Sequence, residues 1–389
     1  MNIILRVLLL FLILTPSVYP AQIPLLENLN LRSLQSAWQE ADIVQPAAPL
    51  PVYNTPAPER GGYNWSGLPA YIFTEDTRIS ATLESAIDRS NTTLDVALYN
   101  LQLNDTVQAL LRARTRGVKV RVIFDYNHVY PRAGPEIQAV IDSGLETRVM
   151  KGRGGSGAMH CKYAVFDGTF LQTGSANWSL SAENASFENM MFVADGNIVR
   201  GYSADFEWMW RQARTTASPM APAAKPGPIP SDPAPSVTFN GAVLPNYIFS
   251  PRGGTEAAIA KAIDAARLEV DVAMFSFTSR PIMDAINRAA GRGVTVNLML
   301  SEKSAFPFRQ EVKWNKINLR FKPGRVGNGL MHNKFAVIDS TLLINGSFNW
   351  SNTAEQLNTE NTIFTTRPEY VGPYKAEFDK LYLKSYAPK

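Results

Sequence analysis

Residues 159–179 read MHCKYAVFDGTFLQTGSANWS, and residues 331–351 read MHNKFAVIDSTLLINGSFNWS. The two stretches share one pattern, His-x-Lys-x4-Asp followed by Gly-Ser-x-Asn, at identical spacing. The chain has only three histidines, and two of them occupy equivalent positions in this repeat. The matched positions are His160, Lys162, Asp167, Ser175 and Asn177 in the first copy, and His332, Lys334, Asp339, Ser347 and Asn349 in the second.

The similarity between the two copies extends well beyond this motif. Matching segments begin at Tyr71 and Tyr247, at Asp95 and Asp271, at Arg116 and Arg292, and at Glu188 and Glu360. The repeat is about 140 residues long, which is the size of an ordinary domain. Solenoid repeats are much shorter, roughly 20–50 residues. The sequence therefore predicts two tandem domains of the same fold.

Composition places the chain among ordinary globular proteins. It has 389 residues, of which 45% are hydrophobic and 19% charged, enough for two packed cores. The net charge of +4 permits an anionic partner but does not require one. The only cysteine, Cys161, excludes an intrachain disulfide.

The ends of the expected domains follow from apolar, proline-rich and glycine-rich segments. Residues 1–21 begin with an apolar run too short for a spanning helix of about 20 residues, and they resemble a secretory signal peptide. We expect an N-terminal arm at 22–69, a first domain at 70–214, a proline-rich linker at 215–243 and a second domain at 244–389. The signal and the lack of disulfides favour an exported bacterial protein, periplasmic or secreted.

Hydrophobic periodicity predicts an α/β sandwich in each domain, with the two domains related by a pseudo-twofold axis. Two short apolar runs flank an amphipathic segment, as in a βαβ unit. A strand pair then turns at Asp167-Gly168, and a last strand precedes a closing helix. In the first domain we predict strands at 94–98, 118–124, 159–166, 169–173 and 189–194, and helices at 105–116 and 197–213.

The motif carries the groups needed to cleave a phosphodiester. Alternation along a strand puts His160 and Lys162 on one face and Cys161 in the core. Lysine suits a phosphate oxygen as a compact charge, and Ser175 and Asn177 could donate hydrogen bonds to non-bridging oxygens. Cleavage needs a nucleophile and a proton donor on opposite sides of phosphorus. We therefore expect the two domains to bring His160 and His332 together across one phosphate.

Two glutamates extend this set. Glu188 and Glu360 each lie 28 residues after the motif histidine of their own copy. A carboxylate hydrogen-bonded to a ring nitrogen would fix the tautomer and stabilise the imidazolium, whereas the alternative is a surface acid before a strand. Only His128 remains as a further histidine, so we expect no metal site and no cofactor.

These residues resemble the phospholipase D superfamily, whose signature is this His-Lys-Asp motif, and the resemblance covers residues 70–386. It implies a metal-independent reaction in which one histidine attacks phosphorus and the other protonates the leaving alcohol. Water or another alcohol then resolves the phosphohistidine. The resemblance implies that His160 is the nucleophile and His332 the acid and then the base. It also implies a phosphate clamp of Lys162, Lys334, Asn177 and Asn349, and structural roles for Asp167 and Asp339.

The Gly-Ser-x-Asn-Trp-Ser and Glu-Asn details are most similar to bacterial single-motif endonucleases and to the cardiolipin-hydrolase branch. Those proteins act as dimers of one repeat, and this chain resembles such a dimer fused in tandem. Hydrolysis of phospholipid headgroups is favoured, because export places the enzyme beside membranes. A metal-independent nonspecific nuclease acting on DNA or RNA and a cardiolipin synthase-like phosphatidyl transferase are the alternatives. The expected partner is a membrane surface or nucleic acid as substrate; both half-sites lie in one chain, so we expect a monomer with no protein partner.

Other positions carry weaker indications, each with a plainer alternative. His128 could touch substrate or be incidental, since it follows a strand where α/β proteins place ligand loops. The matched tryptophans could stack on a base or pack beneath the site. The glycine-rich segments could be cationic lips or turns. These positions are Trp178, Trp350, residues 152–157 with Arg153, and residues 324–329 with Arg325.

Overall fold

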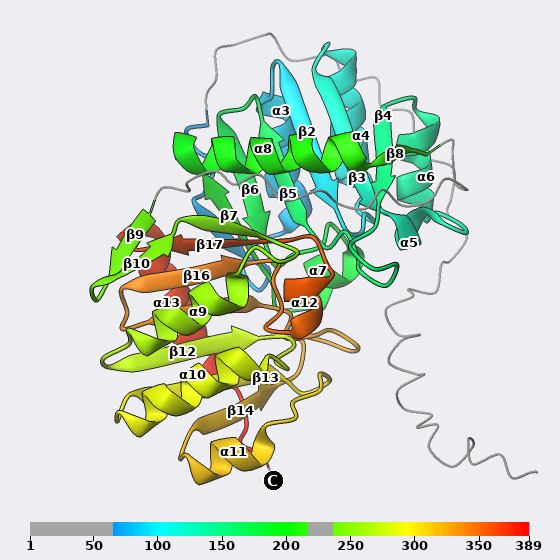
Figure 1. The fold of residues 1–389 in the computed structure, drawn as a ribbon. Helices are drawn as coiled ribbons and strands as arrows, with labels where there is room; N and C mark the ends of the chain where they lie inside the picture. The colour runs from blue at the N-terminus through cyan, green and yellow to red at the C-terminus, as the bar shows by residue number, and fades with distance from the viewer. Residues whose placement is uncertain (1–64, 217–235, 389) are drawn as a thin grey trace, which may run out of the picture. The chain divides into compact units, whose positions relative to one another are not determined.

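A computed structural model describes residues 65–216 and 236–388, which form two halves of the same α/β architecture (Figure 1). The predicted signal peptide and most of the predicted arm lie outside the described residues. The first half has an eight-stranded sheet of order β1-β7-β6-β5-β2-β3-β4-β8, and the second has a seven-stranded sheet of order β11-β17-β16-β15-β12-β13-β14. The same strand order in both halves confirms the predicted tandem α/β fold.

The strands of the first sheet are β1 (Tyr71–Phe73), β2 (Thr93–Leu98), β3 (Lys119–Asp125), β4 (Glu146–Met150), β5 (Lys162–Phe166), β6 (Phe170–Gly174), β7 (Asn189–Val193) and β8 (Arg214–Thr215). Those of the second are β11 (Tyr247–Ser250), β12 (Glu269–Met274), β13 (Thr295–Ser301), β14 (Asn318–Lys322), β15 (Lys334–Ile338), β16 (Leu342–Gly346) and β17 (Glu360–Thr365).

Helices cover both faces of each sheet. On the outer faces lie α3 (Ile79–Arg89), α4 (Asn104–Thr115), α5 (Tyr126–Val129) and α6 (Pro135–Asp142) in the first half, and α9 (Thr255–Asp264), α10 (Arg280–Gly291) and α11 (Arg309–Trp314) in the second. The long helices α8 (Gly196–Gln212) and α13 (Pro368–Leu383) cover the inner faces. Two short helices, α7 (Leu180–Asn184) and α12 (Asn352–Gln356), follow the motifs. No helix in the described ranges has the length and apolar character needed to cross a bilayer.

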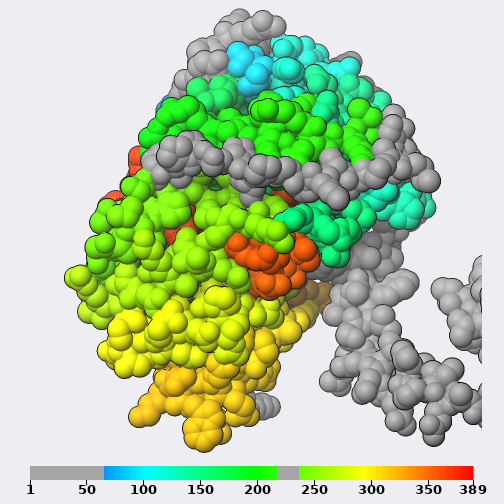
Figure 2. Space-filling model, in the orientation of Figure 1, coloured from blue at the N-terminus to red at the C-terminus, as the bar shows by residue number. Residues whose placement is uncertain are grey.

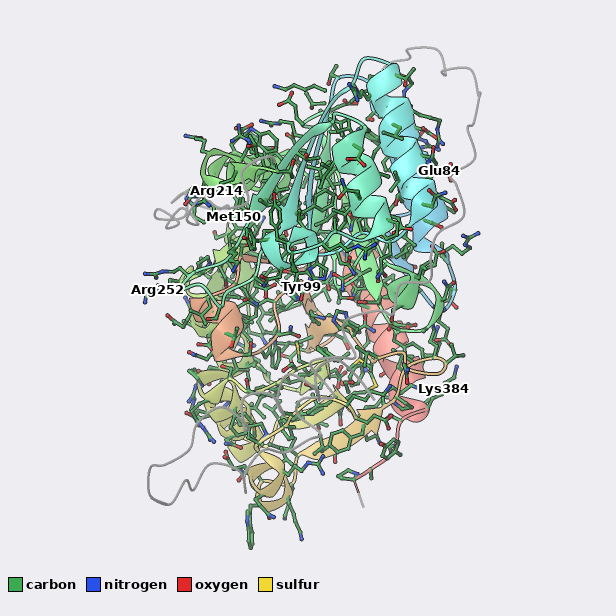
Figure 3. The ribbon with its side chains drawn as sticks, turned by 90° about the vertical axis from the view of Figure 1, so that its right-hand side faces the viewer. Glu84, Tyr99, Met150, Arg214, Arg252 and Lys384 are labelled. Atoms are coloured by element: carbon green, nitrogen blue, oxygen red, sulfur yellow. The ribbon has the colours of Figure 1, made fainter. Side chains whose placement is uncertain are left out.

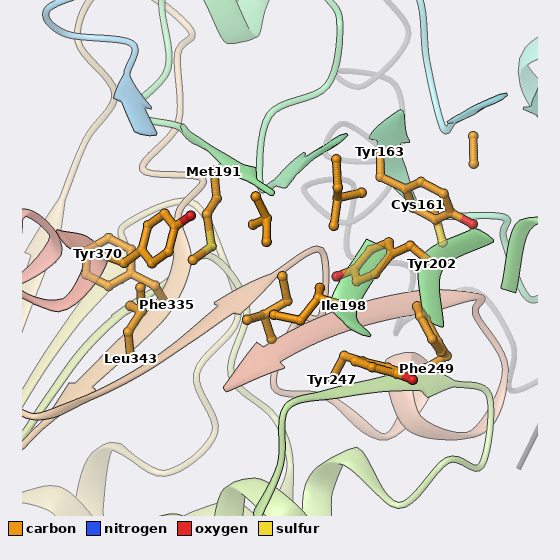
Figure 4. Close-up of a cluster of buried hydrophobic side chains, with 14 of the residues drawn as sticks. Cys161, Tyr163, Met191, Ile198, Tyr202, Tyr247, Phe249, Phe335, Leu343 and Tyr370 are labelled. Carbon is orange, nitrogen blue, oxygen red and sulfur yellow. The ribbon is translucent and has the colours of Figure 1, made fainter. Parts of the chain in front are cut away.

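The inner faces of the two sheets share one hydrophobic core. Tyr202 of α8 packs against Phe249 of β11 with ring centroids 5.0 Å apart, and Phe335 of β15 packs against Tyr374 of α13 at 5.1 Å. Figure 4 shows part of this cluster, where side chains from both halves interleave. Burial of this apolar surface holds the halves together, so the site between them rests on a packed core.

Strand pairing places the two motifs at equivalent positions in their sheets. In each half the first three central strands are parallel (β2-β3-β4 and β12-β13-β14), and the motif strand runs antiparallel beside them. Lys162 therefore pairs with Leu98 at the end of β2, and Lys334 with Met274 at the end of β12. The motif lysines thus lie at the carboxyl ends of parallel strands, where open α/β sheets bind ligands.

The predicted linker is too long at its C-terminal end. Residues 236–239 (β9) and 242–245 (β10) form a hairpin, and Phe239 and Leu244 are buried in the core of the second half. The turn is Asn240-Gly241, with φ of 50° and 89°. An Asn-Gly pair between two short apolar runs is a strong hairpin signal, which the prolines before it obscured. Residues 217–235 of the linker lie outside the described residues.

At the other end, the last part of the predicted arm is packed on the first domain. The ring of Trp65 stacks on Phe170 at 4.8 Å, and its Nε1 donates a hydrogen bond to Thr169 Oγ1 at 3.1 Å.

Candidate active site

The backbone before each motif histidine pairs with the opposite half. Met159 forms a parallel bridge with Thr359, and the His160 amide donates to the Thr359 carbonyl at 3.0 Å. The second half repeats this arrangement, because Met331 bridges Phe187 and the His332 amide donates to the Phe187 carbonyl at 3.0 Å. The strand predicted at 159–166 therefore begins only at Lys162, since residues 158–160 pair across the two halves.

This pairing places each histidine beside the glutamate of the other repeat. Thr359 precedes Glu360, and Glu360 Oε2 lies 2.9 Å from His160 Nδ1. Phe187 precedes Glu188, and Glu188 Oε1 lies 2.7 Å from His332 Nδ1. Both glutamates are buried, and the histidine side chains are 12% and 9% exposed. The histidine–glutamate pairs are therefore crossed between the repeats, and each ring has its Nε2 left to face a substrate.

The motif serines hold the glutamates. Ser175 Oγ donates to Glu188 Oε2 at 2.6 Å, and Ser347 Oγ donates to Glu360 Oε2 at 2.6 Å. Both serines are fully buried, and each also accepts from the backbone amide of the residue after its glutamate. We therefore assign them to orienting the carboxylates, in place of the phosphate contact expected from the sequence.

The glycine before each serine permits this approach. A Cβ atom on Gly174 would lie 2.4 Å from the Asn189 carbonyl oxygen, and one on Gly346 would lie 2.1 Å from the Asn361 carbonyl oxygen. No side chain fits at such distances, so only glycine lets the motif segment pass close to the strand that carries the glutamate.

The motif lysines are buried beneath the histidines. Lys162 Nζ donates to the His160 carbonyl at 2.6 Å, and Lys334 Nζ donates to the His332 carbonyl at 2.7 Å. Each ammonium also lies over an aromatic ring, Tyr99 at 4.8 Å and Phe275 at 5.2 Å. Two buried positive charges at this point suit the binding of an anion.

The motif asparagines also lie here with unused hydrogen-bonding capacity. Asn177 and Asn349 are partly exposed, and the Oδ1 atom of each is buried without a hydrogen-bond partner in the described chain. An unpaired buried acceptor oxygen is costly, and it recurs at matched positions in the two repeats. The tryptophans that follow, Trp178 and Trp350, are buried, so they pack beneath the site.

The motif aspartates lie away from the histidines, where they bind backbone amides. Asp167 accepts from the amides of residues 91–93, and Asp339 from the amides of residues 267–269. Each holds the loop that leads into the first central strand of its half. Both have positive φ, 51° and 50°, as their turns require.

Burial controls the protonation of both imidazoles. It lowers the pKa of His332 to about 4, although Glu188 opposes the shift and Lys334 adds to it. The pKa of His160 is lowered for the same reasons, with Glu360 opposing burial and Lys162 adding to it. Both rings are therefore neutral at pH 7 before a substrate binds, with the Nδ1 proton directed to the carboxylate and a lone pair on Nε2.

Aromatic residues at the ends of β2 and β12 flank the imidazoles and were not identified from the sequence. Tyr99 packs edge-on against His160 at 4.7 Å, and Phe275 packs against His332 at 4.7 Å. Tyr99 also contacts the third histidine, His128, at 4.3 Å, and Figure 3 labels Tyr99 at the boundary between the halves. Tyr99 directly follows the strand predicted at 94–98, and Phe275 follows the equivalent strand of the repeat. That position, where α/β sheets bind ligands, was the signal that could have identified them.

The glycine-rich segments tie the halves together. The Arg153 amide donates to the Leu357 carbonyl and the Arg325 amide to the Ala185 carbonyl. The Arg325 guanidinium also donates to the Thr74 and Glu183 carbonyls. Figure 2 shows the orange surface of α12 against the green surface of the first half at this contact. Arg325 is thus held in place, which does not fit a mobile cationic lip.

Within the described residues, no group of three or more His, Cys, Asp and Glu side chains comes together as a metal site. The absence of a metal requirement remains a prediction.

Both halves of the chain are similar to known proteins. Residues 83–210 and 259–382 match the family described as "Cardiolipin synthase, PLD-like domain". The chain is 34% identical over 124 residues to a mitochondrial cardiolipin hydrolase of Xenopus tropicalis, covering 32% of this chain and 57% of that protein. It is 32% identical over 123 residues to the human mitochondrial cardiolipin hydrolase, covering 31% of this chain and 48% of that protein. The chain thus spans about half the length of these relatives.

A solved structure shares the fold over most of the chain. The phosphatidylserine synthase of Haemophilus influenzae Rd KW20 matches with a TM-score of 0.62 at 12% identity, covering 81% of this chain and 86% of that one. Two matched family segments, one in each half, carry the paired His-Lys-Asp motifs described above. The chain therefore belongs to the phospholipase D superfamily.

Proposed function

We propose that this protein hydrolyses the headgroup phosphodiester of phospholipids through a covalent phosphohistidine intermediate. The observation that carries the proposal is the crossed pair of buried histidine–glutamate hydrogen bonds, at 2.9 and 2.7 Å. Each glutamate fixes Nδ1 as the protonated nitrogen, so that Nε2 of each ring is the reactive atom. The site then contains two imidazoles, each hydrogen-bonded to its own glutamate, so one can attack phosphorus while the other transfers protons.

The reaction follows from this pair. The Nε2 lone pair of one histidine attacks phosphorus, while the other histidine donates its Nε2 proton to the leaving alcohol oxygen. The second histidine is then neutral and takes a proton from water, which attacks phosphorus and returns the bonding pair to the first histidine. The negatively charged phosphate favours imidazolium, and its binding therefore supplies the protonated acid that the unbound site lacks at pH 7.

The remaining polar groups would hold the phosphate. Lys162 and Lys334 supply positive charge, and the amides of Asn177 and Asn349 supply neutral hydrogen bonds to non-bridging oxygens. These charges persist through the transition state, so fixed donors stabilise it without reorganisation. The proposal needs no cofactor, and both half-sites lie in one chain, so a monomer suffices.

Two considerations favour a lipid over nucleic acid. The relatives at 34% and 32% identity are named cardiolipin hydrolases, although the match spans only part of each. The predicted signal at residues 1–21 would also deliver the enzyme to a membrane. A periplasmic or secreted location is part of the same proposal.

The test uses purified protein in EDTA, with anionic phospholipid vesicles and plasmid DNA in parallel reactions. We expect release of phosphatidic acid by the wild type and none by His160→Ala or His332→Ala. Cleavage of DNA without lipid turnover would replace the proposal with a nuclease function. Loss of wild-type activity in EDTA would contradict the metal-independent mechanism.

A further inference from the structure

The surroundings of the two histidines break the symmetry of the repeat. The crossed glutamates, serines and lysines match across the halves, but the residues that flank the imidazoles do not. Three positions beside His160 are Tyr99, Asp125 and His128, and the equivalent positions of the second half are Phe275, Ser301 and Ser304.

The flank of His160 is polar. Asp125 ends β3 and is buried, with His128 Nδ1 at 3.5 Å from its Oδ2 atom. The same carboxylate accepts from the Met159 amide at 2.8 Å, so His128 is linked to the backbone beside His160. Anchoring through Nδ1 leaves His128 Nε2 without a hydrogen-bond partner among residues 65–216 and 236–388, and the side chain is 22% exposed. The ring of Tyr99 packs edge-on against both His128, at 4.3 Å, and His160, at 4.7 Å.

The flank of His332 is less polar. Phe275 contacts the imidazole at 4.7 Å, and it has no group that can hydrogen-bond to an alcohol or water. Ser301 is buried, and its hydroxyl has no hydrogen-bond partner in the described chain. Lys322 ends β14, and its Nζ lies 4.5 Å from the ring of Phe187.

The two histidines have different needs in the reaction. The nucleophile needs only a lone pair and a clear approach to phosphorus. The histidine that serves as acid and then as base gives a proton to an alcohol oxygen in the first step and takes one from water in the second. Both the alcohol and the water must be held by hydrogen bonds.

We infer, on the basis of the proposed function, that the alcohol leaves and water enters on the His160 side. His332 Nε2 then attacks phosphorus, and His160 protonates the alcohol and later deprotonates water. Tyr99 and His128 bind the hydroxyl groups of the alcohol and the attacking water. This order is the reverse of the one that the family resemblance implies.

Each step balances under this assignment. In the first, the bond from His332 Nε2 to phosphorus forms, the phosphorus–alcohol bond breaks, and the alcohol oxygen takes the Nε2 proton of His160. In the second, the water oxygen bonds to phosphorus, the nitrogen–phosphorus bond breaks towards His332, and His160 regains its proton from water. The more deeply buried ring, His332, has a pKa lowered to about 4, which keeps its lone pair available.

The experiment uses bis(p-nitrophenyl) phosphate, because nitrophenolate leaves without needing a proton. The full-length variants His160→Asn and His332→Asn are compared with wild type by rapid mixing and by alkaline peptide mass spectrometry. We expect His160→Asn to release about one equivalent of nitrophenolate per site and then stall, with the adduct on His332. We expect His332→Asn to show no burst and no adduct.

The outcomes separate this inference from the proposed function. A burst from His332→Asn with the adduct on His160 would overturn the order and leave the two-step mechanism standing. Turnover by wild type with no histidine adduct in any variant would overturn the covalent mechanism itself. Circular dichroism of each variant confirms folding.

A second measurement does not depend on removing either reactive imidazole. The double change Tyr99→Phe with His128→Ser gives two of the three positions of the first flank the side chains of the second. We expect it to leave the burst rate unchanged and to slow the later water step about tenfold, the loss of roughly one hydrogen bond to a reacting group. Tyr126→Phe, which removes one hydroxyl from α5, is the matched control. Equal slowing of both phases would contradict the inference.

Discussion

Replacing Glu188 by glutamine tests whether each glutamate acts on the histidine of the other repeat. The change keeps the size of the side chain and removes the charge that lies 2.7 Å from His332 Nδ1. A hydrogen bond to a charged group contributes about 1.5–3 kcal/mol, and a neutral one about 0.5–1.5 kcal/mol. The difference of about 1–2 kcal/mol corresponds to a fall of roughly 5- to 30-fold in kcat/KM.

The same variant should shift the pKa of one imidazole and leave the pKa of the other unchanged. Glu188 raises the pKa of His332, so its neutralisation should lower that pKa further below the ordinary value, whereas the pKa of His160 should not change. The chain has only three histidines, so a proton–nitrogen NMR titration can follow each ring. Glu360→Gln should give the reciprocal result, with His160 shifted and His332 unchanged.

Glu183→Gln is the control, because that buried glutamate binds the Ser80 amide and Arg78 and touches no imidazole. We expect a change in unfolding free energy and no change in either histidine resonance. A shift of His160 in Glu188→Gln, or a rate within twofold of wild type, would refute the crossed arrangement.

The remaining predictions concern pH, a buried acid and the amides. The nucleophile must be neutral and the acid protonated. Burial lowers the pKa of both histidines, so kcat/KM should follow a bell-shaped pH profile centred below 6.5, and kcat one centred higher because bound phosphate favours imidazolium. A kcat/KM optimum above pH 7.5 would contradict this. Burial raises the pKa of Asp205 from 3.8 to about 7, so its ionisation costs stability as pH rises from about 4 to 7, and Asp205→Asn should increase the free energy of unfolding by about 2–4 kcal/mol at pH 8 and by less at pH 5. Urea denaturation at both pH values measures this, and a gain no larger at pH 8 than at pH 5 would contradict it. Asn177→Ala and Asn349→Ala should each lower kcat roughly 10- to 100-fold with little change in melting temperature; a large fall in melting temperature with kcat retained would assign them to the fold.

The duplicated pattern was sufficient to predict the architecture and to select most of the residues that the structure brings together at the candidate site. His160 and His332 recur at one spacing, and strand alternation around them predicted that each histidine shares a face with the lysine two residues on. Those inferences depend on local periodicity, which a sequence records directly.

Pairing between distant segments could not be predicted in the same way. Glu188 lies 28 residues from His160 in sequence but bonds to His332, because the bridge between Phe187 and Met331 determines its neighbour. The serines were assigned to phosphate for the same reason, since nothing local shows that their hydroxyls are already bound by glutamates. Tyr99 lacked a matching partner in the repeat, which has phenylalanine at that position, and a comparison that looks for identity passes over such a residue.

Covalent linkage of the two repeats has a genetic consequence. In a homodimer one gene encodes both sides of a shared site, so every substitution appears twice and the two sides stay chemically identical. Here one side can acquire a tyrosine and a histidine while the other keeps a phenylalanine and a serine. The crossed glutamates make each half of the site depend on the other repeat, and the tandem gene lets selection act on each repeat separately. Fusion thus converts a site that must accept either orientation of a diester into one that can prefer a single orientation.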